Sequence, residues 1–136
     1  GAGLASMDDF VVWQGAIDGN RLLEVSNTGN LWIAGALTEA SSIKLKENVE
    51  TIDNALEKVI SLRGVSYNRT DVDDKSKKIG VIAQEIQKVL PEVVQEQEDG
   101  MLGVSYGNIV GVLIEAIKEQ NQVIEDLKQR IAKLEA

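Results

Sequence analysis

The segment from Asn108 to Ala136 constrains the fold more than any other part of the chain, because its large apolar residues alternate at intervals of three and four. This spacing is typical of a coiled-coil helix. We assign the a positions of the heptad to Leu113, Gln120, Leu127 and Leu134, and the d positions to Ile117, Ile124 and Ile131. Leucine at a with isoleucine at d shifts the preference to three or four strands. The segment therefore predicts one long helix in a coiled coil of three or four strands.

Gln120 is the polar residue of this seam. A polar residue in such a position commonly fixes the register of the helices at a cost in stability. The alternative is an amphipathic helix that folds onto its own domain. Because the heptads continue to Ala136, beyond the other segments of the chain, we favour the coiled coil.

The composition excludes several classes of function. The chain has 136 residues with 14 basic and 22 acidic side chains, a formal charge of -8, so we expect no nucleic-acid partner. It contains no Cys and no His, which removes thiol chemistry, the usual zinc sites and imidazole catalysis, and we expect no cofactor and no metal. No apolar run approaches the roughly 20 residues of a membrane-spanning helix, so we expect no membrane partner. Aromatic residues make up only 4% of the chain, which suggests burial between chains.

The N-terminal part has strand-like patterning. Residues 1–6, GAGLAS, are expected to be a remnant of recombinant expression and are set aside. Residues 7–40 alternate short apolar stretches with turn signals at Asp18–Asn20 and Asn27–Asn30, which predicts short strands. Small units of this kind usually gain stability by stacking or by intertwining with copies of themselves. We therefore expect residues 7–40 to be a fibrous β segment.

Residues 41–107 are expected to mix helices and hairpins, which makes the fold class α+β. Apolar residues from Ser42 to Leu62 recur at helical spacing and predict a helix, and VSYNRT after it predicts a strand. A charged turn, DVDDKSKK, leads to IGVIAQEIQKVL, a second predicted helix that Pro91 ends. EVVQEQEDGMLGVSY predicts a hairpin that turns at Glu98–Gly100. Both turns are expected to form hairpin tips that project outward.

A cluster of serine and lysine precedes the first predicted helix and contains Ser41, Ser42, Lys44 and Lys46. Without His, a serine nucleophile can be activated by a lysine whose amine is kept neutral by burial or by a neighbouring cation. Lys44 is such a neighbour of Lys46, and the Ser-Lys dyad is a recognised catalytic arrangement. The alternative is that both serines only cap the following helix and that the lysines are solvated.

Three blocks of the chain together resemble the C-terminal intramolecular chaperone domain of phage tailspikes and tail fibres, the self-cleaving module known from endosialidases. The blocks are SSIKLKENVETIDNALEKVISLRGVSYNR, IGVIAQEIQKVLPEVV and VSYGNIVGVLIEAIKEQ. The resemblance implies a homotrimer that holds three chains together while the upstream β-stalk folds and then cuts itself away. It also implies a virion tail appendage precursor that is made in the cytoplasm of the host bacterium and releases the chaperone domain after cleavage.

The resemblance further implies the catalytic residues. In the family's motif the lysine lies five residues after the serine, which carries over onto Ser41 as nucleophile and Lys46 as base. The family usually has an aspartate after that serine and an arginine two residues before that lysine, and this chain has Ser42 and Lys44 there. Lys44 is thus a possible assisting cation. Ser42 is a rival nucleophile, because residues four apart on a helix lie on one face and would bring it to Lys46.

Ring size limits the bond that Ser41 can cut within its own chain. Attack on the preceding carbonyl closes a five-membered ring, whereas attack on its own carbonyl closes a strained four-membered ring. Cleavage within one chain therefore favours the Ala40-Ser41 bond. If a neighbouring chain supplies the serine or the lysine, the bond after Ser41 is also open, and cutting then depends on assembly.

The expected organisation is a remnant at 1–6, a stalk end at 7–40, a chaperone and self-cleavage domain at 41–107, and a coiled-coil helix at 108–136. The expected function is an intramolecular chaperone that trimerises, assists folding of a phage tail appendage and releases itself by single-turnover serine proteolysis. The alternative is a non-catalytic trimerisation or attachment domain of a fibrous protein.

Overall fold

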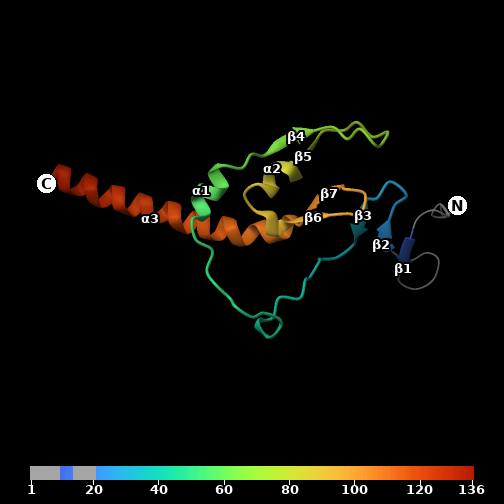
Figure 1. Cartoon of the computed structure of the whole chain (residues 1–136), viewed down its shortest axis with the longest axis horizontal. Coiled ribbons are helices and arrows are strands. Elements are labelled where there is room, and N and C mark those ends of the chain that lie inside the picture. The colour runs from blue at the N-terminus through green and yellow to red at the C-terminus, as the bar shows by residue number, and fades with distance from the viewer. Residues whose placement is uncertain (1–9, 14–20) are drawn as a thin grey trace. The chain divides into compact units, whose positions relative to one another are not determined.

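The computed structural model describes residues 10–13 and 21–136 (Figure 1). The remnant predicted at residues 1–6 and the turn predicted at Asp18–Asn20 lie outside the described residues. Contacts divide the chain into two compact units, residues 1–48 and 49–136, which are described in turn. The elements are short helices, small antiparallel sheets and one long C-terminal helix, which confirms the predicted α+β class.

The first unit contains a three-stranded antiparallel sheet in the order β1-β2-β3. The strands are β1 (Phe10–Trp13), β2 (Arg21–Val25) and β3 (Leu31–Ile33). Each lies in a stretch that was predicted to be a strand. In the pairing of β2 with β3, Leu23 lies opposite Ile33 and Val25 opposite Leu31. The turn between these strands is where the sequence predicted it, and Gly29 there has a φ of +80°, which glycine adopts at little cost.

The helix predicted from Ser42 to Leu62 is wrong over most of its length. A single 3-10 turn, η1, spans Ile43–Leu45, and helix α1 covers only Ala55–Ile60. The backbone between them is irregular, and Asn48 and Asn54 have positive φ values of 52° and 50°. This left-handed conformation interrupts a right-handed helix, and asparagine tolerates it better than most residues. The two asparagines therefore separate η1 from α1.

The second unit contains two antiparallel hairpins. One pairs β4 (Val65–Tyr67) with β5 (Lys78–Gly80), and the other pairs β6 (Val94–Glu96) with β7 (Leu102–Val104). The second hairpin was predicted, and Gly100 in its turn has a φ of +83°. The loops of both hairpins extend away from the C-terminus of the chain (Figure 1).

Helix α2 is shorter than the sequence predicted and covers Ala83–Gln87. The start of the predicted helix is strand β5 instead, because this stretch pairs with β4. Pro91 does not end the helix. It opens the 3-10 turn η2 (Pro91–Val93), at a position where a missing N–H costs no helical hydrogen bond.

The core of the second unit is small and lies along the N-terminal half of helix α3 (Ile109–Glu135), which follows the 3-10 turn η3 (Tyr106–Asn108). Its buried side chains are Ala55, Ile86, Leu90, Val93, Val112 and Ala116. Helix α3 confirms the prediction of one long helix in the C-terminal segment. Figure 1 shows α3 extending well past α1, and from residue 118 onward every residue except Glu119 is exposed.

The heptad lettering that was predicted for this helix is wrong. Ile117 follows Leu113 by four residues and precedes Gln120 by three. Because an a position precedes d by three residues, the isoleucines occupy a, whereas the leucines and Gln120 occupy d. Isoleucine at a with leucine at d favours two strands, so the seam by itself does not predict a trimer.

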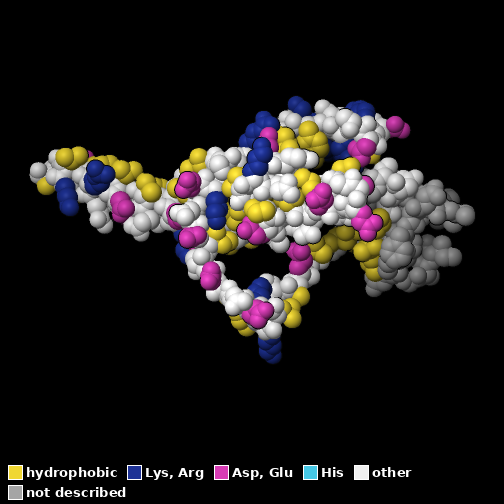
Figure 2. Space-filling view, viewed as in Figure 1, with side chains coloured by type: hydrophobic (Ala, Val, Ile, Leu, Met, Phe, Trp, Pro, Cys, Tyr) yellow, Lys and Arg dark blue, Asp and Glu magenta, His cyan; other side chains and the backbone are white. Residues whose placement is uncertain are grey.

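The buried residues of α3 lie beside this seam and not in it. In the corrected lettering Val112 is at c and Ala116 at g, and both pack in the core. The seam residues face solvent, and Ile117 and Leu127 are 66% and 49% exposed. Figure 2 shows hydrophobic side chains along the free part of the helix. Thus α3 has two adjacent apolar stripes, of which one packs on its own unit and the other has no cover in the described part of the chain.

Candidate Ser-Lys site

The candidate site is one tight turn of the first unit. Ser42 is the N-cap of η1, with extended backbone, and its Oγ accepts a hydrogen bond from the backbone N–H of Lys44 at 3.3 Å. The N–H of Lys46 donates to the carbonyl oxygen of Ile43 at 3.1 Å. This turn reverses the chain, so that the side chain of Lys46 returns to Ser41.

Lys46 and Ser41 are in direct contact. The Nζ of Lys46 donates a hydrogen bond to the Oγ of Ser41 at 2.7 Å and to the carbonyl oxygen of Ser41 at 2.6 Å. A separation of 2.7 Å between the amine and the hydroxyl is within the range over which a base takes a proton from its nucleophile. The structure thus brings together the two residues that the sequence pattern paired.

Ser42 is placed differently. Its Oγ is engaged by the N–H of Lys44, and among the described residues the amine of Lys46 bonds to Ser41 and to no atom of Ser42. The reason for treating Ser42 as a rival was its position four residues before Lys46 on an α-helix. That reason is wrong, because this stretch is a 3-10 turn. Ser42 caps this 3-10 turn, and not the α-helix that the capping alternative assumed.

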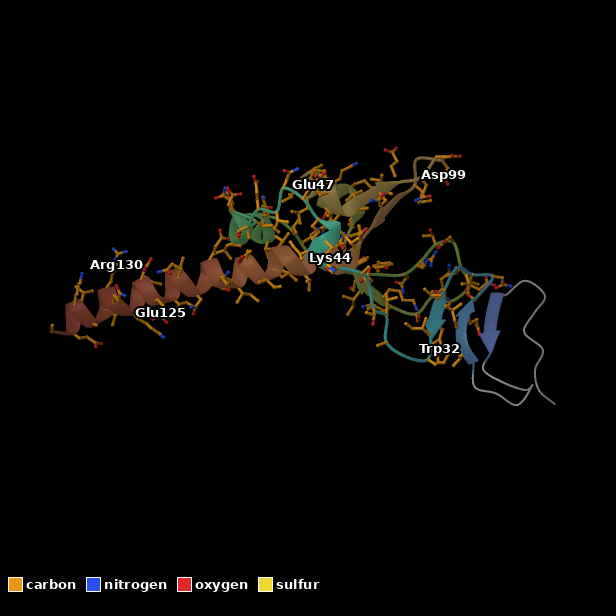
Figure 3. All side chains as sticks on the ribbon, turned by 90° about the horizontal axis from the view of Figure 1, so that it is seen from below. Trp32, Lys44, Glu47, Asp99, Glu125 and Arg130 are labelled. Carbon is orange, nitrogen blue, oxygen red and sulfur yellow. The ribbon has the colours of Figure 1, made fainter. Side chains whose placement is uncertain are left out.

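The whole turn is exposed to solvent. Its exposed residues are Ser41, Ser42, Ile43, Lys44, Leu45 and Lys46. Lys44 and Glu47 also project from this segment (Figure 3). An ammonium donates hydrogen bonds and cannot accept a proton, so a reaction at Ser41 requires the amine in its neutral form. The geometry therefore positions the nucleophile, and chemistry further requires surroundings that favour a neutral amine.

The carboxylates of Glu85 and Asp74 lie in ion pairs. Neither was predicted to be catalytic. Arg63 donates hydrogen bonds to both carboxylate oxygens of Glu85, with Nη2 at 2.7 Å from Oε1, and this contact lowers the pKa of Glu85. In the loop of the β4-β5 hairpin, the backbone N–H of Ser76 and the ammonium of Lys78 lower the pKa of Asp74 to about 2. Both carboxylates are therefore tied into the local structure of the second unit.

Two further contacts in the second unit were not predicted from the sequence. The Oε2 of Glu119 accepts a hydrogen bond from the backbone N–H of Leu56 at 2.6 Å, so that α3 caps the first turn of α1. The hydroxyl oxygen of Tyr106 accepts a hydrogen bond from the N–H of Val81 at 3.1 Å. The partners are 63 and 25 residues apart in the sequence, and no local signal marks them.

The comparison with protein families agrees with the resemblance seen in the sequence. Residues 41–95 match the sequence model of a family that is named as a peptidase and described as the chaperone of endosialidase. The matched region begins at Ser41 and includes Lys46. In the described part of the chain, no helix has both the length and the apolar character that crossing a membrane requires.

Known relatives include phage tail fibre proteins. The chain is 36% identical over 98 residues to the long tail fiber protein Gp37 of Enterobacteria phage K3 and 38% identical over 93 residues to that of Enterobacteria phage M1. These alignments cover 67% and 62% of this chain but only 8% and 37% of the two relatives. The Myelin regulatory factor homolog 1 of Caenorhabditis elegans is 30% identical over 114 residues, which are 76% of this chain and 12% of that protein. The chain thus spans only a part of the length of these relatives.

Proposed function

Because residues 41–95 belong to the family of the endosialidase chaperone, we propose that this chain is an intramolecular chaperone of a phage tail fibre or related tail appendage. It assembles with copies of itself, assists folding of the upstream fibre, and then releases itself by cutting at Ser41. In this proposal residues 7–40 are the end of a trimeric β-stalk, residues 41–107 the chaperone and self-cleavage domain, and residues 108–136 the coiled-coil helix. The precursor is made in the host cytoplasm, and the chaperone domain leaves after cleavage.

The contact between the Nζ of Lys46 and the Oγ of Ser41, at 2.7 Å, carries the catalytic part of the proposal. In its neutral form the amine of Lys46 accepts the hydroxyl proton, and Oγ attacks the carbonyl carbon of Ala40. The C–N bond of the Ala40-Ser41 peptide then breaks, and the proton passes from Lys46 to the nitrogen of Ser41. The resulting ester between Ala40 and Oγ is hydrolysed by water, which leaves a carboxylate on Ala40 and a free hydroxyl and amine on Ser41.

Assembly is proposed to control the charge of the base. Burial disfavours an ammonium, and so does a second cation nearby. Lys44 is that second cation, while Ile43 and Leu45 on the same turn are 70% and 69% exposed and offer apolar surface to cover. Covering the turn when chains assemble removes water from Lys46 and favours the neutral amine. Cleavage then depends on assembly, and a monomeric variant that cuts itself at the native rate would show this part to be wrong.

We propose that the assembled state is a homotrimer. The a and d residues of α3 support self-association because they form a continuous uncovered seam. The apolar face is wider than this seam near the start of the helix, since Ile114, at e, is also 54% exposed. A helix with two neighbours buries a wider arc than a helix with one. Ile114 thus favours three chains, as the resemblance to trimeric fibre chaperones also does.

The residues that flank the seam support a parallel arrangement. In parallel helices in register, a g residue faces the e residue that lies five positions later in the partner. This rule sets Arg130 against Glu135 of a second copy, which are opposite charges. It sets Ile109, which is half-buried against the core of its own unit, beside Ile114 of a second copy, and both are apolar. Arg130 projects from the free part of α3, where a partner can reach it (Figure 3).

The two hairpins are proposed to act as arms on the folding stalk. The loop between β4 and β5, residues 68–77, and the loop between β6 and β7, residues 97–101, are both mostly exposed. Strands of a partly folded stalk have unpaired edges, which pair wrongly when they are left uncovered. Arms that cover such edges until three chains have paired would assist correct folding.

Denaturing mass spectrometry of the purified chain tests the proposal directly. We expect two fragments that meet at the Ala40-Ser41 bond. They should disappear with Ser41→Ala and with Lys46→Ala, and persist with Ser42→Ala. If every sample stays intact, the chain is the alternative, a non-catalytic trimerisation or attachment domain, which the capping role of Ser42 and the exposed site favour. If fragments still form in Ser41→Ala, another residue is the nucleophile.

The mass of the assembly in solution tests the seam separately. Light scattering should give three chains for the native sequence. Ile124→Lys places a charge in the seam and should yield monomers, whereas the matched control Gln122→Lys, at the outward f position, should leave the assembly unchanged. A mass of two chains would show that the assembly is not a trimer, although self-association through the seam would still hold.

A further inference from the structure

A groove lies between α1 and α3, beside the exposed seam. It has a volume of about 410 Å³ and is lined by Asn54, Leu56, Glu57, Ile60, Glu119 and Val123. Its apolar wall is open to solvent, since Ile60 is 73% and Val123 50% exposed. The carboxylate of Glu119 is already held by the N–H of Leu56. Because exposed apolar surface is unfavourable in water, a side chain that covers this wall would stabilise the helix pair.

The lettering of α3 identifies the side chain of a second copy that reaches this groove. Val123 is at g, on the flank of the seam that faces α1. In parallel helices in register, a g residue faces the e residue five positions later in the partner, which for Val123 is Lys128. This step rests on the parallel self-association proposed above, and it holds for two chains as well as for three.

Lysine has the chemistry that the groove fits. Its four-carbon stem covers apolar surface while its ammonium stays at the polar rim. Glu57 lies on that rim, and within the described residues its carboxylate makes no hydrogen bond or ion pair. In the single chain Lys128 pairs with Glu125 at 3.1 Å on the surface of its own helix. An exposed pair of this kind is weak and easily exchanged.

We propose that the groove of one chain receives Lys128 of a second copy, with the stem against Ile60 and Val123 and the ammonium beside Glu57. Helix α1 has only six residues, and such a short helix is unstable on its own. In the assembly it is held between its own α3 and the α3 of the neighbour. Self-association therefore stabilises α1 and the seam together.

Disulfide trapping tests this contact, because this chain contains no cysteine. Chains with Ile60→Cys and chains with Lys128→Cys are unfolded together, refolded as a mixture and oxidised. We expect a mixed disulfide between the two kinds of chain, detected by intact mass. In the matched control, chains with Ile60→Cys are mixed with chains with Lys118→Cys. Lys118 is exposed and lies at the outward b position, so this mixture should give no mixed disulfide.

A seam pair makes the outcomes distinguishable. Leu127→Cys should form a disulfide with its own copy, because d residues of parallel helices meet at the axis. If Leu127→Cys links and Ile60→Cys with Lys128→Cys does not, the groove contact is wrong and the seam stands. If neither links, the parallel self-association itself is wrong.

Charge reversal provides a second measurement without cysteine. Glu57→Lys should raise the dissociation constant of the assembly about two- to five-fold, which is the range of an exposed ion pair. Glu57→Lys combined with Lys128→Glu should recover most of that loss. An equal loss with Glu92→Lys, on η2 and away from the groove, would show that the effect is one of net charge and would overturn the contact.

Discussion

The hydroxyl of Tyr106 lies where a side chain at Gly80 would begin. A β-carbon added to Gly80 would be 2.5 Å from this oxygen, closer than real contacts allow. The same oxygen accepts the hydrogen bond from the N–H of Val81 at 3.1 Å. Tyr106, in the 3-10 turn η3, and Gly80, at the end of β5, are thus fitted to each other at the base of the β4-β5 hairpin.

Gly80→Ala should therefore destabilise the second unit by about 1 kcal/mol, because the half-exposed Tyr106 must shift and lose its hydrogen bond to Val81. Tyr106→Phe removes the hydroxyl and should cost about 1 kcal/mol for the lost hydrogen bond. In the Tyr106→Phe background, Gly80→Ala should cost clearly less, because the clashing atom is gone. Urea unfolding at a fixed protein concentration measures all four chains. The matched control is Gly103→Ala in β7, where the nearest atom to an added β-carbon is at 3.9 Å. A cost at Gly103 as large as at Gly80 would contradict the contact.

Glu119 stabilises the start of α1 through the N–H of Leu56. Asn54, the N-cap residue of α1, makes no capping hydrogen bond with its own side chain, so Glu119 replaces that function from another helix. Glu119→Ala should cost about 1 kcal/mol, as the loss of an N-cap does. Glu119→Gln keeps an acceptor oxygen and should cost less. Urea unfolding checks this, with Gln129→Ala on the exposed helix surface as the control that stays within about 0.5 kcal/mol of the native chain. Equal losses for Glu119→Ala and Gln129→Ala would remove the capping role.

Elements with local signals were predicted well from the sequence. The turn signal at Asn27–Asn30 predicted the β2-β3 pair, and the turn signal at Gly100 predicted the second hairpin. The periodicity of the C-terminal segment predicted the length of α3. The helix predicted from residue 42 failed because Ile52 packs on the core from a loop, and its spacing to Leu56 imitates a helix. The two left-handed asparagines were the available local signal for a break.

The candidate site was predictable in its residues and not in its geometry. The resemblance to the family's motif paired Ser41 with Lys46, but the contact forms through a 3-10 turn and not through an α-helix. The contacts of Glu119 and Tyr106 depend on how α3 lies against α1 and against the β4-β5 hairpin. Packing between distant segments decides them, and sequence patterns do not encode it locally.

The ion pair between Arg63 and Glu85 makes the stability of the second unit depend on pH. The contact lowers the pKa of Glu85, so its contribution is complete above the ordinary glutamate value of about 4.3 and is lost as the pH falls through the lowered value. Glu85→Gln should therefore be less stable than the native chain at pH 7, and the difference should shrink toward pH 3. Urea midpoints at pH 7, 5 and 3 measure it. Glu92→Gln, whose carboxylate has no ion pair within the described residues, is the control without this pH dependence. A difference that stays constant with pH would exclude the ion pair as its cause.

Asp74 in the β4-β5 loop should titrate with a pKa of about 2. The backbone N–H of Ser76 is the largest cause, followed by the ammonium of Lys78. Ser76→Ala keeps the N–H and should leave most of the depression, whereas Ser76→Pro removes the N–H and should return the pKa toward the ordinary value of about 3.9. NMR titration of the side-chain carboxyl gives these values. An unchanged pKa in Ser76→Pro would assign the depression to another group.

Lys46→Arg separates positioning from proton transfer at Ser41. Arginine keeps the positive charge and the hydrogen-bond donors, but it does not give up its proton. If Lys46 is the base, self-cleavage should fall by at least about 100-fold, while assembly and circular dichroism stay unchanged. The matched control is Lys44→Arg, which keeps the assisting cation and should cut at about the native rate. The cut fraction is followed over time by intact mass. Native-rate cleavage by Lys46→Arg would mean that this side chain only holds Ser41 in place and that the base is another group.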